Sequence, residues 1–173
     1  SPQYQAMDWL ANEDSFPIHF QNTSTHFILM ERYVLAVLYF STGGPYWNDN
    51  LNFLSNYSIC EWPSFGEEES QATTSNEVDC EDGSVVKISI SKDEGTSVLV
   101  AGTGKFSLVS ALFVLIHPEK NNQTGTIPSE LSALSNLQIL QLAFGNLFGT
   151  IPQSLGDIPK LNFLQLSVQS LTG

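Results

Sequence analysis

A repeat of 24 residues in the last third of the chain limits the fold more than any other feature of the sequence. Apolar residues and glycine recur at this offset in two consecutive copies. The first copy comprises Leu131, Leu134, Leu137, Leu140, Leu142, Leu147 and Gly149, and the second comprises Leu155, Ile158, Leu161, Leu164, Leu166, Leu171 and Gly173. One such unit cannot bury its leucines alone, so the units are expected to stack and to share a continuous core.

Each repeat is predicted to contain one short strand and one return segment. Leu140-Gln141-Leu142 alternates apolar and polar side chains, which is typical of a strand with one buried face. The leucines spaced by three before it suit a helical or irregular return. Pro128 and Pro152 suit the first position of the turn that opens this return, because the N–H that proline lacks would have no partner there.

The element Gly-Thr-Ile-Pro, at residues 125–128 and 149–152, completes a pattern that resembles the plant-type leucine-rich repeat. The resemblance is close over residues 121–173. It implies an α/β fold, namely a right-handed leucine-rich-repeat solenoid whose strands line a concave face, with a helical N-terminal cap. Residues 85–173 are expected to form the repeats, with a degenerate first unit and a truncated last unit. The chain is therefore expected to be a fragment whose last leucine layer is uncovered.

The earlier repeats depart from the family pattern. Residues 85–90 are predicted to form the first strand, with about four extra residues after it. The unit at residues 99–118 is degenerate, and Pro118 would interrupt a strand because it has no N–H to donate. The asparagine that follows each strand in the family is represented in successive units by Asn121, Gly145 and Gln169. Only the first of these fits, and Asn146, one residue late, is a candidate substitute.

Residues 1–84 are expected to form an acidic, helical N-terminal cap. Ser1 is a candidate N-cap with Pro2 at the first helical position. A second helix is predicted over residues 25–40, ended by Gly43, Gly44 and Pro45. Since apolar residues occupy most sides of this helix, we expect it to be well buried. Such a cap would cover the leucines at the first end of the solenoid.

The segment from Gly43 to Trp47, followed by Cys60, Trp62 and Cys80, resembles the Cys-flanked cap of plant-type leucine-rich-repeat receptors. It is still more similar to the related proteins of diatoms and other stramenopile algae, as is the opening Ser-Pro-Gln-Tyr-Gln-Ala. In those proteins the repeats commonly follow a membrane anchor. The resemblance thus implies an anchor upstream of this segment, at the cell surface.

Two interpretations of Cys60 and Cys80 are open from the residues. They are buried free thiols, or they form one disulfide that closes a loop of about 20 residues and stabilises the fold by about 3 kcal/mol. Three glycosylation sequons begin at Asn22, Asn56 and Asn122. Together with a cysteine pair in polar surroundings, they favour an oxidising, secretory environment and a glycoprotein.

The formal charge of −12 is unevenly placed. Residues 1–82 carry 13 acidic side chains and 1 basic one, whereas residues 83–173 carry 5 of each. This excess of negative charge argues against nucleic acid as a partner and against electrostatic binding to anionic lipid. No apolar run approaches the length of about 20 residues that a membrane span needs. The acidic stretch at residues 66–82 is interpreted as a solvated loop, with Ca²⁺ binding as the alternative.

No catalytic residue, metal site or cofactor is predicted. Gly102-Thr-Gly104-Lys105 fails as a phosphate loop, because Leu99 and Phe106 stand where glycine and Ser/Thr are needed. The three histidines are scattered without metal-ligand spacing. Catalysis would require a domain outside this segment, such as the kinase that can follow the repeats in the family.

The surface expected to carry function is the concave one, where the residues that flank the buried strand leucines point outward. Three columns are predicted, namely Leu115, Ile139 and Phe163, then His117, Gln141 and Gln165, then Glu119, Ala143 and Ser167. The first, apolar column is either a contact surface or partly covered by its neighbours. The second is polar and uncharged and suits hydrogen bonds to a peptide or glycan.

The function implied is extracellular recognition of a protein, peptide or glycan by a receptor-like cell-surface protein. One alternative is a structural adhesion module of the cell surface or cell wall without signalling. A second alternative is the ectodomain of a receptor kinase whose catalytic domain lies outside this segment.

Overall fold

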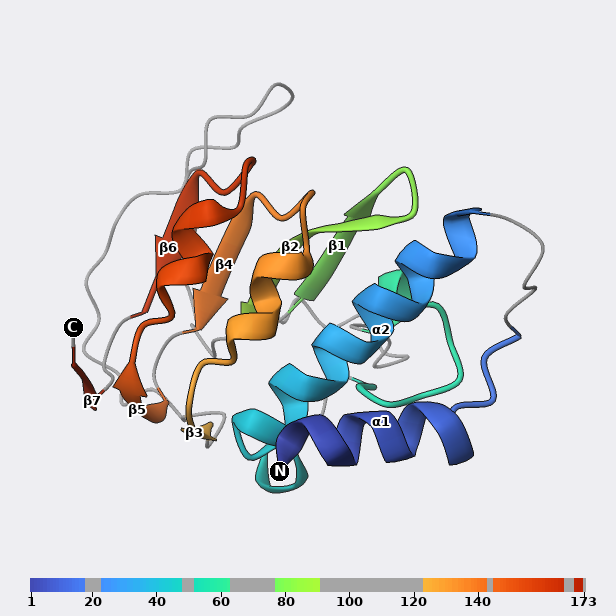
Figure 1. The fold of residues 1–173 in the computed structure, drawn as a ribbon, viewed down its shortest axis with the longest axis horizontal. Coiled ribbons are helices and arrows are strands. Elements are labelled where there is room, and N and C mark those ends of the chain that lie inside the picture. The colour runs from blue at the N-terminus through green and yellow to red at the C-terminus, as the bar shows by residue number, and fades with distance from the viewer. Residues whose placement is uncertain are drawn as a thin grey trace, which may run out of the picture.

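The computed structural model describes residues 1–17, 23–47, 52–62, 77–90, 123–142, 145–166 and 170–172, and every structural statement below concerns these residues. They form a mixed α/β fold with two N-terminal helices and two rows of largely parallel strands. In Figure 1 the helices lie at the end of the fold where the first two strands are found. The degenerate unit at residues 99–118 lies outside the described residues.

The two predicted helices are confirmed. Helix α1 spans Pro2–Asn12, and the Ser1 side chain caps it by accepting a hydrogen bond from the N–H of Tyr4. Helix α2 spans Thr23–Ser41 and extends slightly beyond the prediction at both ends. Two residues after its end at Ser41, Gly43 has a left-handed φ of 73°, which favours glycine. The short 3-10 helix η1, Gly44–Tyr46, follows at once.

The first row of strands is a four-stranded sheet in the order β1-β2-β4-β6. Its strands are β1 (Glu77–Glu81), β2 (Ser84–Ile90), β4 (Ile139–Leu142) and β6 (Phe163–Gln165). β1 is antiparallel to β2, and the other pairs are parallel. The prediction of a strand at residues 85–90 is thus confirmed, and its parallel neighbour is the strand predicted around Gln141.

The second row has the order β3-β5-β7 and is parallel. Its strands are β3 (Thr124–Gly125), β5 (Asn146–Thr150) and β7 (Ser170–Thr172). In the first row Ile139 pairs with Phe163, at the 24-residue offset of the sequence repeat. In the second row Gly149 pairs with Leu171, two residues short of it. A shift of two residues keeps every side chain on its own face of the strand.

The return segments are short 3-10 helices. These are η3 (Ser129–Ala133) and η4 (Gln153–Asp157), while η2 (Ile59–Glu61) belongs to the cap. Pro128 and Pro152 occupy the N-cap positions of η3 and η4, so the prediction that they take the first helical position is wrong by one residue. Their extended backbone ends the preceding strand segment before the chain turns.

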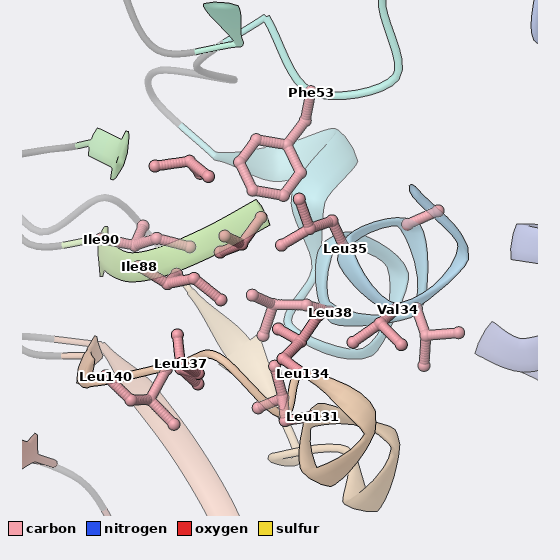
Figure 2. Close-up of a cluster of buried hydrophobic side chains, with 14 of the residues drawn as sticks. Val34, Leu35, Leu38, Phe53, Ile88, Ile90, Leu131, Leu134, Leu137 and Leu140 are labelled. Carbon is pink, nitrogen blue, oxygen red and sulfur yellow. The ribbon is translucent and has the colours of Figure 1, made fainter. Parts of the chain in front are cut away.

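One continuous core joins the cap to the repeats. In Figure 2, Leu35 and Leu38 of α2 point toward Ile88 of β2 and the repeat leucines Leu134 and Leu137. Burying one such side chain contributes about 1.5–3 kcal/mol. Leu140 is fully buried, whereas its counterpart Leu164 on β6 is 43% exposed. The last described leucine layer therefore has less cover than the layer before it.

The acidic stretch is not entirely a loop, and this corrects the sequence interpretation. Residues 66–76 lie outside the described part, but Glu77–Glu81 form β1, and a turn at Asp82-Gly83 leads into β2. Both turn residues have positive φ, 50° and 78°. This is the geometry that favours Asp-Gly in a two-residue hairpin. The strand β1, from the segment expected to be the cap, thereby joins the same sheet as β2, β4 and β6.

Candidate ligand-binding face

The sheet β1-β2-β4-β6 has one buried face and one outer face. Leu140 and Leu142 of β4 point into the core and are fully buried, while Ile139 and Gln141 between them are half-buried. Successive side chains of a strand point to opposite faces, so Ile139 and Gln141 lie on the outer face. We call this side of the sheet, with the residues of the next paragraph, the outer sheet face.

Strand register aligns the side chains of the outer sheet face in two rows. One row comprises Asp79, Lys87, Ile139 and Phe163, and the other comprises Ser89, Gln141 and Gln165. The Ser89 hydroxyl donates to Oε1 of Gln141 over 3.2 Å, although Ser89 is itself buried. The structure thus brings together the predicted pairs Ile139 with Phe163 and Gln141 with Gln165.

The remaining predicted positions of these columns cannot be placed in this way. Leu115, His117, Glu119, Ala143 and Ser167 lie outside the described residues. Ile139 and Phe163 are both half-buried, which is intermediate between the two interpretations of the apolar column. The sequence analysis missed Asp79, because it treated the acidic stretch as a loop. It also missed Lys87, because it did not extend the outward-facing columns to the strand predicted at residues 85–90.

A groove with a volume of about 520 Å³ lies at the cap end of the outer sheet face. It is lined by Cys60, Val78, Asp79, Cys80, Glu81, Val86, Lys87, Gln138 and Ile139. Nζ of Lys87 lies 3.6 Å from the Asp79 carboxylate, and the Gln138 amide donates to Glu81 over 3.4 Å. Burial raises the pKa of Asp79 and lowers the pKa of Lys87. The Lys87 side chain is 25% exposed and the Asp79 side chain 52%, and partial burial disfavours the charged form of each.

Cys60 and Cys80 form a disulfide, so the interpretation as free thiols is wrong. Their Cα atoms are 5.6 Å apart, and the bond ties η2 to β1 at the wall of the groove. With a sequence separation of 20 between the two cysteines, such a bond stabilises the fold by about 3 kcal/mol in the chain-entropy model. A structural disulfide of this kind is typical of an oxidising compartment.

Arg32 is the centre of the cap and belongs to no ligand site. Its side chain is fully buried, and its Nε donates to the carboxylate of Asp14 over 2.6 Å. Its other donors reach the carbonyls of Ser55 and Tyr57. The guanidinium also lies against three aromatic rings, those of Trp9, Phe16 and Trp62. Arg32 therefore joins both helices to the segment after η1, and each of its three guanidinium nitrogens donates a hydrogen bond.

Glu31, next to Arg32, is a buried carboxyl with incomplete hydrogen bonding. Its Oε1 accepts from the N–H of Val85 over 3.2 Å, which links α2 to β2. Its Oε2 is buried, and no described group donates to it. Burial raises the pKa of Glu31 from 4.5 to about 7, although the Val85 hydrogen bond opposes the rise.

Replacing Glu31 by glutamine is expected to remove one pH-dependent term from the stability. The folded protein holds the Glu31 proton more tightly than the unfolded chain does, so this group destabilises the fold progressively between pH 4.5 and about 7. The full effect, present above pH 7, is about 3 kcal/mol. Urea unfolding across this range should therefore show Glu31→Gln equal to wild type at the acidic end and more stable at the neutral end. A constant difference between the two proteins would contradict the assignment.

Gln123, two residues after Asn121, bonds its side chain to the backbone, which is the role that the family resemblance implies for the asparagine after a strand. Its side chain is buried, and its Nε2 donates to the carbonyl of Ile90 at the end of β2 over 2.6 Å. The backbone carbonyl of Gln123 accepts a hydrogen bond from the N–H of Asn146. Asn146 has an exposed side chain at the start of β5, so no described contact makes it the substitute. The signal in the sequence was a polar side chain, Gln123, two residues after Asn121, where the family has asparagine.

The described residues offer few sites of other kinds. They contain no group of three His, Cys, Asp or Glu side chains placed to hold a metal ion. Within the same ranges, no helix is both long and apolar enough to cross a bilayer. Of the three sequons, Asn22 and Asn122 lie outside the described residues, and Asn56 is exposed.

The geometry defines a mixed α/β protein with parallel strands, two N-terminal helices and an outer sheet face whose described side chains are mostly half-buried. No protein-family model matches the chain, and no curated protein matches it significantly. Among solved structures, the crystal structure described as PEPR1-AtPEP1 matches 83% of this chain with 17% identity and a TM-score of 0.39. This chain spans 18% of that one. A likeness at this level does not define a family.

Proposed function

We propose that the chain is an extracellular recognition module of the leucine-rich-repeat type, which binds a protein, peptide or glycan ligand on the outer sheet face. In this proposal residues 85–173 form a right-handed solenoid and residues 1–84 its cap. The 24-residue repeat and the parallel pairing of Ile139 with Phe163 support the solenoid. The disulfide and the exposed Asn56 support a secreted or surface-tethered glycoprotein.

One observation carries the binding role. The register of β1, β2, β4 and β6 aligns the charged, polar and apolar side chains of the outer sheet face in two rows. Behind them, Val78 of β1, Ile88 of β2 and Leu140 of β4 are buried in the core. Side chains on a rigid sheet are held in place before a ligand arrives, which lowers the entropic cost of binding. The described residues contain no cluster that suggests catalysis, and we propose that this segment has none.

Replacing Phe163 by aspartate is expected to weaken ligand binding at least about tenfold without unfolding the chain, because it puts a charge in an apolar contact. Ligands would first be selected from a displayed peptide library and a glycan array with the wild-type protein. Phe148→Asp is the matched control, since Phe148 is 53% exposed on β5 in the second row of strands. Equal binding by both variants would contradict the proposal, and unfolding of Phe163→Asp would make Phe163 a core residue.

A further inference from the structure

The groove at the cap end of the outer sheet face has a net negative charge. Among its lining residues, Asp79 and Glu81 are acidic and exposed, and Lys87 is basic. The Lys87 amine is drawn to Asp79, so it is poorly placed to receive an anion without giving up this partner. An incoming cation would instead meet the carboxylate of Glu81, which faces only the neutral Gln138 amide, and would share the carboxylate of Asp79 with Lys87. Val86 and Ile139 of the lining provide apolar surface for the methylene stem of a lysine or arginine.

The net charge of residues 1–82 has the same sign as that of the groove. Residues 1–82 hold 13 acidic side chains and 1 basic one, and that basic one, Arg32, is already paired with Asp14. A field of one sign over a groove raises the local concentration of oppositely charged ligands and speeds their association. The cap end of the outer sheet face therefore favours the positively charged part of a ligand.

Further along the same row the chemistry changes from charged to apolar. Lys87 pairs with Ile139 on β4, and Ile139 with Phe163 on β6. With about 4.8 Å between neighbouring strands, Asp79 and Phe163 are about 14 Å apart across three strand spacings. Four residues of an extended peptide cover about 13.5 Å, and residues four apart point to the same side. An extended peptide laid across the strands thus matches the spacing of the two ends.

We propose that the groove takes the basic side chain of an extended peptide, which places a large apolar side chain on Ile139 and Phe163 four residues away. This inference rests on the proposed function of the outer sheet face and adds the chemistry of its ligand. The carboxylates of Asp79 and Glu81 receive the cation. Ile139 and Phe163 contact the apolar side chain of the peptide, and their distance from the groove sets the separation of four residues between its basic and apolar side chains.

The test uses defined peptides and the intact chain. The probe is a fluorescent peptide with lysine, three residues drawn from serine and glycine, and then leucine. One comparison peptide has the same composition with lysine next to leucine, and another has glutamate in place of lysine. Fluorescence anisotropy at low and physiological salt should show that the probe binds best and that salt weakens its binding, because exposed charges are screened.

Two groove variants and one control locate the cation. Asp79→Asn and Glu81→Gln are each expected to weaken probe binding about fivefold to tenfold, as loss of a charged contact of about 1 kcal/mol implies. Asp157→Asn removes the same charge from η4, outside the groove, and should change binding less than about twofold. Urea unfolding of all three variants would show that each is folded.

Each outcome is decisive. Equal binding of the probe and the rearranged peptide, or no effect of either groove variant, would overturn this inference. If library peptides bind in a manner that depends on Phe163 while the probe does not bind, the proposed function stands and the inference fails. If neither the library nor the glycan array yields a ligand, the proposed function fails and the inference fails with it.

Discussion

Replacing Arg32 by leucine is expected to lower the free energy of unfolding by about 3–5 kcal/mol, because it leaves the buried carboxylate of Asp14 without its cation. The substitution also removes donors from the carbonyls of Ser55 and Tyr57. This is a large part of the 5–15 kcal/mol that usually stabilises a domain. Guanidinium unfolding followed by tryptophan fluorescence would measure it, since Trp9 and Trp62 lie against the guanidinium.

The control removes the same charge from the surface. Lys160 is exposed and bonds only to Asn136 among the interactions described, so Lys160→Leu is expected to change stability by less than about 0.5 kcal/mol. The double variant Arg32→Leu/Asp14→Leu should be more stable than Arg32→Leu alone, because no unpaired charge stays buried. Equal stability of Arg32→Leu and Lys160→Leu would show that the buried ion pair does not hold the cap together.

Replacing Gly125 by alanine is expected to destabilise the protein by about 3–5 kcal/mol or to prevent its folding. A Cβ atom at Gly125 would lie 2.0 Å from the carbonyl oxygen of Ser41, and its φ of 130° is unfavourable for other residues. The approach is this close because β3 runs against the end of α2. The N–H groups of Thr124 and Thr126 donate to the carbonyls of Thr42 and Ser41.

Gly156→Ala is the matched control for this prediction. A Cβ atom at Gly156 in η4 would meet no atom within 4 Å, and its φ lies outside the range that favours glycine. We expect it to be within about 0.5 kcal/mol of wild type in urea unfolding. A Gly125→Ala protein as stable as Gly156→Ala would mean that β3 does not dock on the end of α2.

The spacing of apolar residues predicted the strand β4 and its buried leucines well. Leu140 and Leu142 alternate with polar neighbours, and the leucines spaced by three fill the core that Figure 2 shows. Such periodicity is a direct consequence of the geometry of strands and returns, so it can be read locally. The same alternation placed Gln141 on the outer face, and the structure pairs it with Gln165.

The features that join the cap to the repeats were harder to predict, because they depend on contacts distant in sequence. Glu31 accepts a hydrogen bond from Val85, 54 residues away in the sequence, and Arg32 donates to Asp14, 18 residues away. Local sequence patterns do not predict contacts over such separations. A signal existed, since charged residues in a helix that is apolar on most sides are buried only when they have partners. Asp82-Gly83 was a second signal, because this pair favours a hairpin and would have indicated β1.

The docking of β3 on the end of α2 also affects the register of the strands that follow it. The last carbonyls of α2 hold β3, and β5 and then β7 pair in parallel beside it. On the other row, β1 aligns β2, which aligns β4 and β6. Each strand thus inherits its register from the one before it, and the cap supplies the starting point for both rows. A shift in register at β1 or β3 would therefore change the pairing of every later strand in that row. A shift at β6 would change the pairing of β6 alone.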